Sequence, residues 1–77
     1  MTYREYAKKQ VEGRTDAEIN ENVPFNPDSE MVFVKNNGDH TEYLINGYHF
    51  FMNHSSFDTV ENQDEDGDII ESWNLDY

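Results

Sequence analysis

The dipeptide Asn46-Gly47 constrains the fold of this chain more than any other feature, because Asn-Gly is the strongest short signal for a two-residue turn between antiparallel strands. Residues 40–45 and 48–53 on either side are rich in the aromatic and β-branched residues that strands favour. The sequence therefore predicts a β-hairpin that spans 40–53.

A two-residue loop also determines which side chains lie across from one another in this hairpin. The predicted cross-strand pairs are Ile45 with Tyr48, Tyr43 with Phe50, and Thr41 with Met52. These six side chains should form one largely apolar face. The opposite face would hold His40, Glu42, Leu44, His49, Phe51 and Asn53, and our hypothesis is that an N-terminal helix half covers it.

Turn residues divide the rest of the C-terminal part into further strands. We predict strands at 31–35, 57–62 and 68–75, with turns at 36–39, 54–56 and 64–67. In the last strand, Ile69, Trp73 and Leu75 should face the core, and Asp68, Ser72, Asn74 and Asp76 should face away. A three-residue turn would place Glu61 opposite Glu71, a like-charge pair that lowers stability, unless the register differs.

Two capping-box spacings, Thr2 with Glu5 and Thr15 with Glu18, indicate helix starts before the sheet. The first predicts a helix over 3–12, and the second predicts a shorter helical segment that ends before Pro24. The expected architecture is a single acidic α+β domain over 1–77, helical in 1–23 and an antiparallel sheet in 31–77. The N-terminal helix should pack on a four- to five-stranded antiparallel β-meander.

Charge is distributed unevenly along the chain. It has 17 acidic and 5 basic residues, a formal net charge of -12, and no basic residue after Lys35. The negative electrostatic field of such a chain attracts basic partners and repels nucleic acid and anionic membranes. We therefore expect a basic protein as partner, no direct nucleic-acid binding and no membrane association.

The composition also indicates the cellular compartment in which we expect the protein. Without cysteine it has neither disulfides nor thiolate metal ligands. Residues 1–14 lack an apolar signal segment, and no apolar run approaches the roughly 20 residues of a membrane span. We expect a cytoplasmic protein, located in the host cytoplasm if a phage encodes it. Eleven aromatic residues argue against a disordered chain.

An acidic segment at 62–73 resembles a calcium loop in spacing only. Asp64, Asp66 and Gly67 would fill the third, fifth and sixth positions of an EF-hand, but Trp73 stands where a bidentate glutamate is required. The flanking patterns also predict strands where an EF-hand needs helices. An acidic turn with loose cation association explains this segment better than a calcium site.

Other chemistry finds little support in the sequence. The spacing of His49 and His54 does not suit a zinc site, and the chain has no cysteine that could supply a thiolate ligand. Ser55 and Ser56 lie beside His54 in a short turn, where adjacent side chains rarely reach the geometry of nucleophilic catalysis. Trp73 is most simply a core residue, since it shares a face with Ile69 and Leu75; the alternative is that it anchors a binding surface. We predict no enzyme activity, no cofactor and no metal.

The density of negative charge approaches that of nucleic acid. A domain of this length is about 30 Å across, so its net charge averages about one per 2.5 Å, against one per 1.7 Å in duplex DNA. Carboxylates two residues apart on one strand face lie about 6.6 to 7 Å apart. Each of them can accept a bidentate hydrogen bond from an arginine that normally binds phosphate.

In length, charge, lack of cysteine and expected sheet with a helix, the chain resembles the small acidic inhibitors encoded by phages. These include uracil-DNA glycosylase inhibitor, anti-restriction DNA mimics and several anti-CRISPR proteins. The resemblance implies a non-catalytic monomer or homodimer that blocks the nucleic-acid-binding site of a CRISPR effector, restriction enzyme or DNA repair enzyme. The predicted contacts are Asp58, Glu61, Asp64, Glu65, Asp66, Asp68, Glu71 and Asp76, with Asp39 and Glu42 as a second patch.

Two other functions remain open at this point. A nuclease-toxin immunity protein would also be small and acidic, and would also bind a basic active site. An acidic accessory domain whose charge serves solubility alone would have no mimic role.

Overall fold

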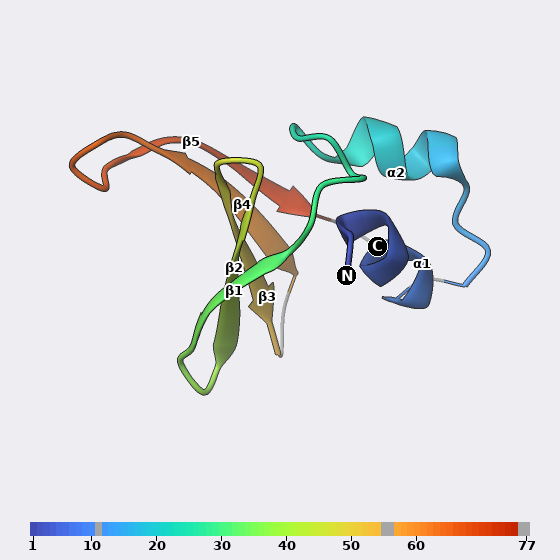
Figure 1. Ribbon diagram of the computed structural model, residues 1–77, viewed down its shortest axis with the longest axis horizontal. Coiled ribbons are helices and arrows are strands. Elements are labelled where there is room, and N and C mark those ends of the chain that lie inside the picture. Colours follow the sequence, from blue (N-terminus) through green and yellow to red (C-terminus); the bar gives the residue numbers. More distant parts are fainter. Residues whose placement is uncertain (11, 55–56, 76–77) are drawn as a thin grey trace.

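The computed structural model describes residues 1–10, 12–54 and 57–75 (Figure 1). Two helices precede five strands: α1 (Tyr3–Gln10), α2 (Asp16–Asn22), β1 (Val32–Asn36), β2 (His40–Ile45), β3 (Tyr48–Asn53), β4 (Asp58–Gln63) and β5 (Ile69–Leu75). The strands form one antiparallel sheet in the order β1-β2-β3-β4-β5. The predicted α+β class and the meander are confirmed.

The central hairpin, β2 and β3, has the register that its turn predicts. Ile45 pairs with Tyr48, and the ladder continues in step to His40 with Asn53. Asn46 and Gly47 have φ angles of 48° and 85°, and a two-residue turn of this type needs positive φ at both positions. The turn chemistry therefore fixes which hairpin side chains face the core.

The capping boxes explain where both helices begin. In α2 the Thr15 hydroxyl accepts a hydrogen bond from the Glu18 backbone N–H at 3.2 Å, and the Glu18 carboxylate accepts from the Thr15 N–H at 3.4 Å. Thr2 and Glu5 make the equivalent pair of bonds before α1. The predicted extent of the first helix, 3–12, is wrong at its end, because α1 ends at Gln10. Residue 11 lies outside the described residues.

The two helices pack against a single face of the sheet. Tyr3 and Tyr6 from α1 both contact the ring of Phe50, at centroid distances of 5.6 Å. The buried core consists of Tyr3, Tyr6, Ala7, Ile19, Val23, Phe25, Ile45, Phe50, Val60 and Leu75. The hypothesis that a helix covers the face with Glu42 and His49 is wrong. The helices bury the apolar face instead, because it offers the larger gain from removing apolar surface from water.

A buried hydrogen bond joins α1 to β4. The Tyr6 hydroxyl donates to the Asp58 carboxylate at 2.7 Å, and the Asn53 backbone N–H also donates to that carboxylate, at 3.2 Å. Tyr6 is 6% exposed and Asp58 is also 6% exposed. Burial, and then the bond to Asp58, raise the pKa of the Tyr6 phenol above its ordinary value.

This raised pKa predicts a loss of stability in alkali. The folded protein holds the phenol proton more tightly than the unfolded chain, so the contribution is fully present below pH about 10 and falls as pH rises above it. Urea titrations between about pH 8 and 11 should show unfolding free energy falling by up to about 1.4 kcal/mol per pH unit from this group. Tyr6→Phe should remove that slope and should cost about 1–3 kcal/mol at neutral pH, because Asp58 loses a buried partner.

The matched control is Tyr48→Phe. It removes a tyrosine hydroxyl from β3, on the sheet face that Ile45 shares, without touching the hydrogen bond between Tyr6 and Asp58. It should retain the alkaline slope. Equal slopes in both variants would show that Tyr6 is not the group responsible.

The predicted register of the last hairpin is wrong in detail. Glu61 lies opposite Ser72, and Glu71 lies opposite Asn62, so the expected like-charge pair does not form. A register shift beside Asn62 offsets the two strands, and β5 begins at Ile69 where the prediction had Asp68. This irregularity separates two carboxylates that a regular ladder would have placed in direct opposition.

Candidate functional site

The β4–β5 hairpin extends beyond the rest of the sheet. β3 pairs with β4 only as far as the pair His49 with Glu61, whereas β4 and β5 continue to pair up to Gln63 and Ile69. Figure 1 shows the hairpin pointing away from both helices. Every residue over 64–71 is exposed. The end of this hairpin is therefore a two-stranded projection that a partner can approach from either face.

Asp64 shapes the turn at the tip of the projection. Its Oδ1 accepts hydrogen bonds from the backbone N–H groups of Asp66 and Asp68, both at 2.9 Å. The Gly67 N–H donates to the Asp64 carbonyl at 3.1 Å, and Gly67 has a φ of 86°, which favours glycine. Asp64 therefore has a structural part in the turn in addition to its charge.

We name the exposed acidic residues of this projection the acidic tip. It consists of Asp64, Glu65, Asp66, Asp68 and Glu71. The segment 64–71 contains no basic residue, so its charge is not compensated within the hairpin. It is the most concentrated group of the predicted contact residues that the structure brings together.

The helical end of the molecule differs, because ion pairs join its acids to bases there. Arg4 contacts Asp28 at 2.7 Å and Asp16 at 2.9 Å, and Lys8 contacts Asp16 at 2.9 Å. Hydrogen bonding from Arg4 lowers the pKa of Asp28, and hydrogen bonds from Lys8 and then Arg4 lower the pKa of Asp16. Two of the five bases are therefore used to hold the helices together, which leaves the acidic tip as the more strongly negative end.

Two of the predicted contact residues are buried and do not belong to the exposed acidic surface. Asp58 is held by Tyr6 and Asn53 in the core. Glu42 is 9% exposed, and its Oε2 lies 2.9 Å from Nδ1 of His49. The sequence analysis predicted both as partner contacts and placed Glu42 on the face opposite the apolar one, whereas the packed structure gives each carboxylate a hydrogen-bond partner, as buried carboxylates require.

The other predicted contacts are separated from one another. Glu61 is partly buried and accepts a hydrogen bond from the Gln63 side chain at 3.0 Å. Asp39 is exposed in the turn between β1 and β2, which Figure 1 shows well away from the acidic tip. Because Glu42 is buried, the predicted second patch is reduced to Asp39. Asp76 lies outside the described residues.

An exposed pair of isoleucines beside the acidic tip was missed by the sequence analysis. Ile69 is 57% exposed and Ile70 is 58% exposed. The prediction that Ile69 faces the core is wrong, because the core ends nearer the helices, where Trp73 is half-buried against Tyr48 and Leu75 is fully buried. The available signal was the adjacency of the two isoleucines, since neighbouring strand residues point to opposite faces.

Three carboxylates of the acidic tip lie close enough to approach one cation. One oxygen from each of Asp64, Asp66 and Asp68 falls within 4.8 Å of the others, and all three residues are exposed. Strands flank this turn on both sides, which excludes the helix–loop–helix of an EF-hand. One Asp64 oxygen already accepts two backbone hydrogen bonds.

The three histidines have separate hydrogen-bond partners. His49 pairs with Glu42, His40 lies 3.0 Å from the Asp39 carboxylate, and His54 contacts the Thr41 hydroxyl at 3.1 Å. His54 also contacts the Gly38 carbonyl through its other ring nitrogen. All three histidines therefore make these hydrogen bonds with residues of β2 or of the turn between β1 and β2.

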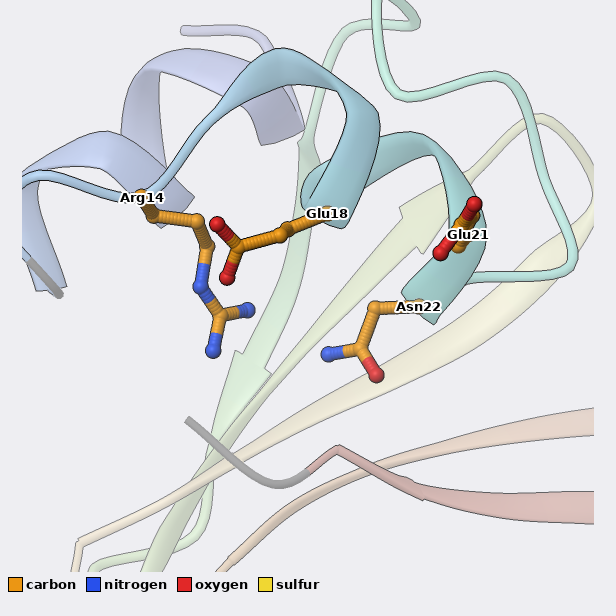
Figure 2. A pocket seen from close by; sticks show the side chains of 4 residues that line it. All are labelled: Arg14, Glu18, Glu21 and Asn22. Atoms are coloured by element: carbon orange, nitrogen blue, oxygen red, sulfur yellow. The ribbon is translucent and has the colours of Figure 1, made fainter.

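A hollow of about 380 Å³ lies beside α2 (Figure 2). Its lining consists of Arg14, Glu18, Glu21 and Asn22. Glu18 already serves the helix cap, and the lining mixes one guanidinium with two carboxylates. This combination favours neither an anionic nor a cationic ligand, and it offers no nucleophile.

Comparison with known proteins adds no relative. No protein-family model, curated protein or solved structure matches the chain. Neither helix in the described part of the chain is long and apolar enough to cross a membrane.

Proposed function

We propose that the protein is a non-catalytic inhibitor that occupies the basic nucleic-acid-binding site of a target protein and acts there as a DNA mimic. The single observation that carries the proposal is the acidic tip, in which five exposed carboxylates project on a hairpin that has no basic residue. An arginine that normally binds phosphate can bind each of these carboxylates through two hydrogen bonds. The chain would then compete with nucleic acid for one site.

The dimensions of the molecule suit this role. Its longest axis is 38 Å, so a net charge of -12 averages about one negative charge per 3 Å, roughly half the density of duplex DNA. The shorter axes are 25 and 20 Å, similar to the thickness of a duplex. A cleft shaped for a duplex can therefore accept the projecting hairpin and part of the sheet behind it.

The target class follows from the same chemistry. A CRISPR effector, a restriction enzyme and a DNA repair enzyme each bind DNA through a basic surface, and inhibition of the first two would serve a phage as an anti-defence activity. Such a protein acts in the host cytoplasm. Ile69 and Ile70 add apolar contact area beside the carboxylates, which a hydrophobic spot next to the arginines would bury.

The decisive experiment combines capture with competition. The purified protein is used as bait in a lysate of its natural host, retained proteins are identified, and duplex DNA is added as competitor. The proposal expects a nucleic-acid enzyme that DNA releases and whose activity the protein inhibits. A retained partner that DNA does not release would favour an immunity protein against a toxin, and no retained nucleic-acid enzyme would favour an acidic domain whose charge serves solubility.

Salt should have opposite effects on folding and on binding. Raising salt from about 10 to 150 mM screens repulsion among clustered carboxylates, so the free energy of unfolding of the free protein should rise. The same screening should weaken its complex with a basic target. Urea titration and binding isotherms at matched salt concentrations measure both. Stability that does not change with salt would contradict strong repulsion within the acidic tip.

A further inference from the structure

Strand β1 is an edge strand of the sheet, and the chain just before it forms a β-bridge between Glu30 and Thr2. Strand β1 pairs with β2 on one side and is the terminal strand in the sheet order. All five of its residues are exposed, and three consecutive ones are apolar: Val32 is 57% exposed, Phe33 60% and Val34 46%. An exposed apolar edge strand can add a further strand through its free backbone groups.

The apolar surface at this edge continues onto β2. Val32 pairs with Leu44, which is 37% exposed, and the ring of Phe33 contacts that of Tyr43 at 6.0 Å. Lys35 is the only charged residue in β1, and it lies opposite the buried Glu42. The β1 edge therefore combines apolar side chains with little net charge.

The two edges of the sheet differ sharply in charge. The order of strands places β5 and the acidic tip at the edge opposite β1. Two β5 edges would bring like charges together, which destabilises strand pairing. Two β1 edges would not, so repulsion between copies selects β1 as the edge at which this acidic protein can approach itself.

We propose that the protein forms a symmetric dimer in which two β1 strands pair antiparallel and produce one continuous sheet. This pairing is centred on Val34, which lies at the register shift of β1, so that Phe33 (opposite Tyr43) and Lys35 (opposite Glu42) project from opposite faces of the sheet. A two-fold interface of this kind uses the same patch on both copies and is therefore closed.

The distances in such a dimer keep the acidic tips apart. With strands about 4.8 Å apart, the two β5 strands of a ten-stranded sheet would be separated by about 43 Å. This separation is about five times the screening length of about 8 Å at physiological salt. The free edges of the dimer are acidic, so association stops at two copies. The dimer leaves both acidic tips exposed and forms whether or not they bind a nucleic-acid enzyme.

Sedimentation of the purified full chain over about 1 to 500 μM tests this dimer. The average mass should rise from 9.1 kDa toward twice that value, and it should rise at lower concentration when salt is increased. Val34→Lys places like charges across the two-fold axis and should weaken the dimer at least about tenfold. A monomer throughout this range overturns the proposal.

The matched control is Ile70→Lys. It makes the same change of charge at an exposed β-branched strand residue on the opposite edge, and should leave the dimer intact. If Ile70→Lys disrupts association and Val34→Lys does not, the β1 assignment is wrong. Hydrogen exchange of the unmodified protein gives an independent measurement. Amides within 32–36 should exchange more slowly at high protein concentration, and unchanged rates would overturn the interface.

Discussion

Replacement of Glu65 and Asp66 by lysine should weaken binding to the captured target about 100-fold or more and should abolish inhibition. Each carboxylate that binds an arginine makes a charge-assisted hydrogen bond worth about 1.5–3 kcal/mol, and charge reversal adds repulsion. Both side chains are exposed. The free energy of unfolding should therefore change by less than about 1 kcal/mol. Binding isotherms and urea titrations of the same preparations test both expectations.

The structure provides a control with the same change in charge. Glu12 and Glu21 are exposed at the helical end, and their replacement by lysine also takes the formal net charge from -12 to -8. If the position of the charge matters, this control should bind within about threefold of the unmodified protein, as expected for charges outside an interface. Equal loss in both variants would show that net charge alone drives the association. Asp64 is left unchanged because its side chain holds the turn.

The largest effect on stability is expected from Phe50→Ala. Phe50 is fully buried at the centre of the apolar face, where Tyr3, Tyr6 and Tyr43 contact its ring. Removing a buried phenylalanine costs about 3–5 kcal/mol. A chain of this length has a total stability of roughly 4–12 kcal/mol. The variant should be largely unfolded or close to it, as measured by circular dichroism and urea titration.

Phe57→Ala is the comparison for this substitution. Phe57 is 60% exposed, and the hydrogen bond that its carbonyl accepts from Asn53 survives truncation of the side chain. The expected cost is below about 1 kcal/mol. If the two variants lost similar stability, the placement of Phe50 in the core would be wrong.

Local sequence signals were sufficient for most of the fold. Asn46-Gly47 set the register of β2 and β3 because a two-residue turn leaves no freedom in pairing. The Thr15–Glu18 box positioned the start of α2 because its hydrogen bonds are made within one turn. These features depend on neighbours in the chain, so the sequence alone predicts them.

The burial of individual acids could not be predicted in the same way. Asp58 is separated from Tyr6 by 52 positions, and no spacing rule connects a helix residue to a strand so distant. Glu42 looked available because its face seemed polar, but His49 on the next strand accounts for its carboxylate. The register of the last hairpin changed because one irregular pair near Asn62 moved every later partner.

The two-stranded end of the β4–β5 hairpin separates the requirements of folding from those of recognition. Its exposed side chains contribute little to the core, and its shape depends mainly on Asp64 and Gly67 in the turn. Substitutions at Glu65, Asp66 or Ile70 can therefore accumulate with little loss of stability. Under the proposed function, a protein built in this way can follow changes in its target while it keeps the same scaffold.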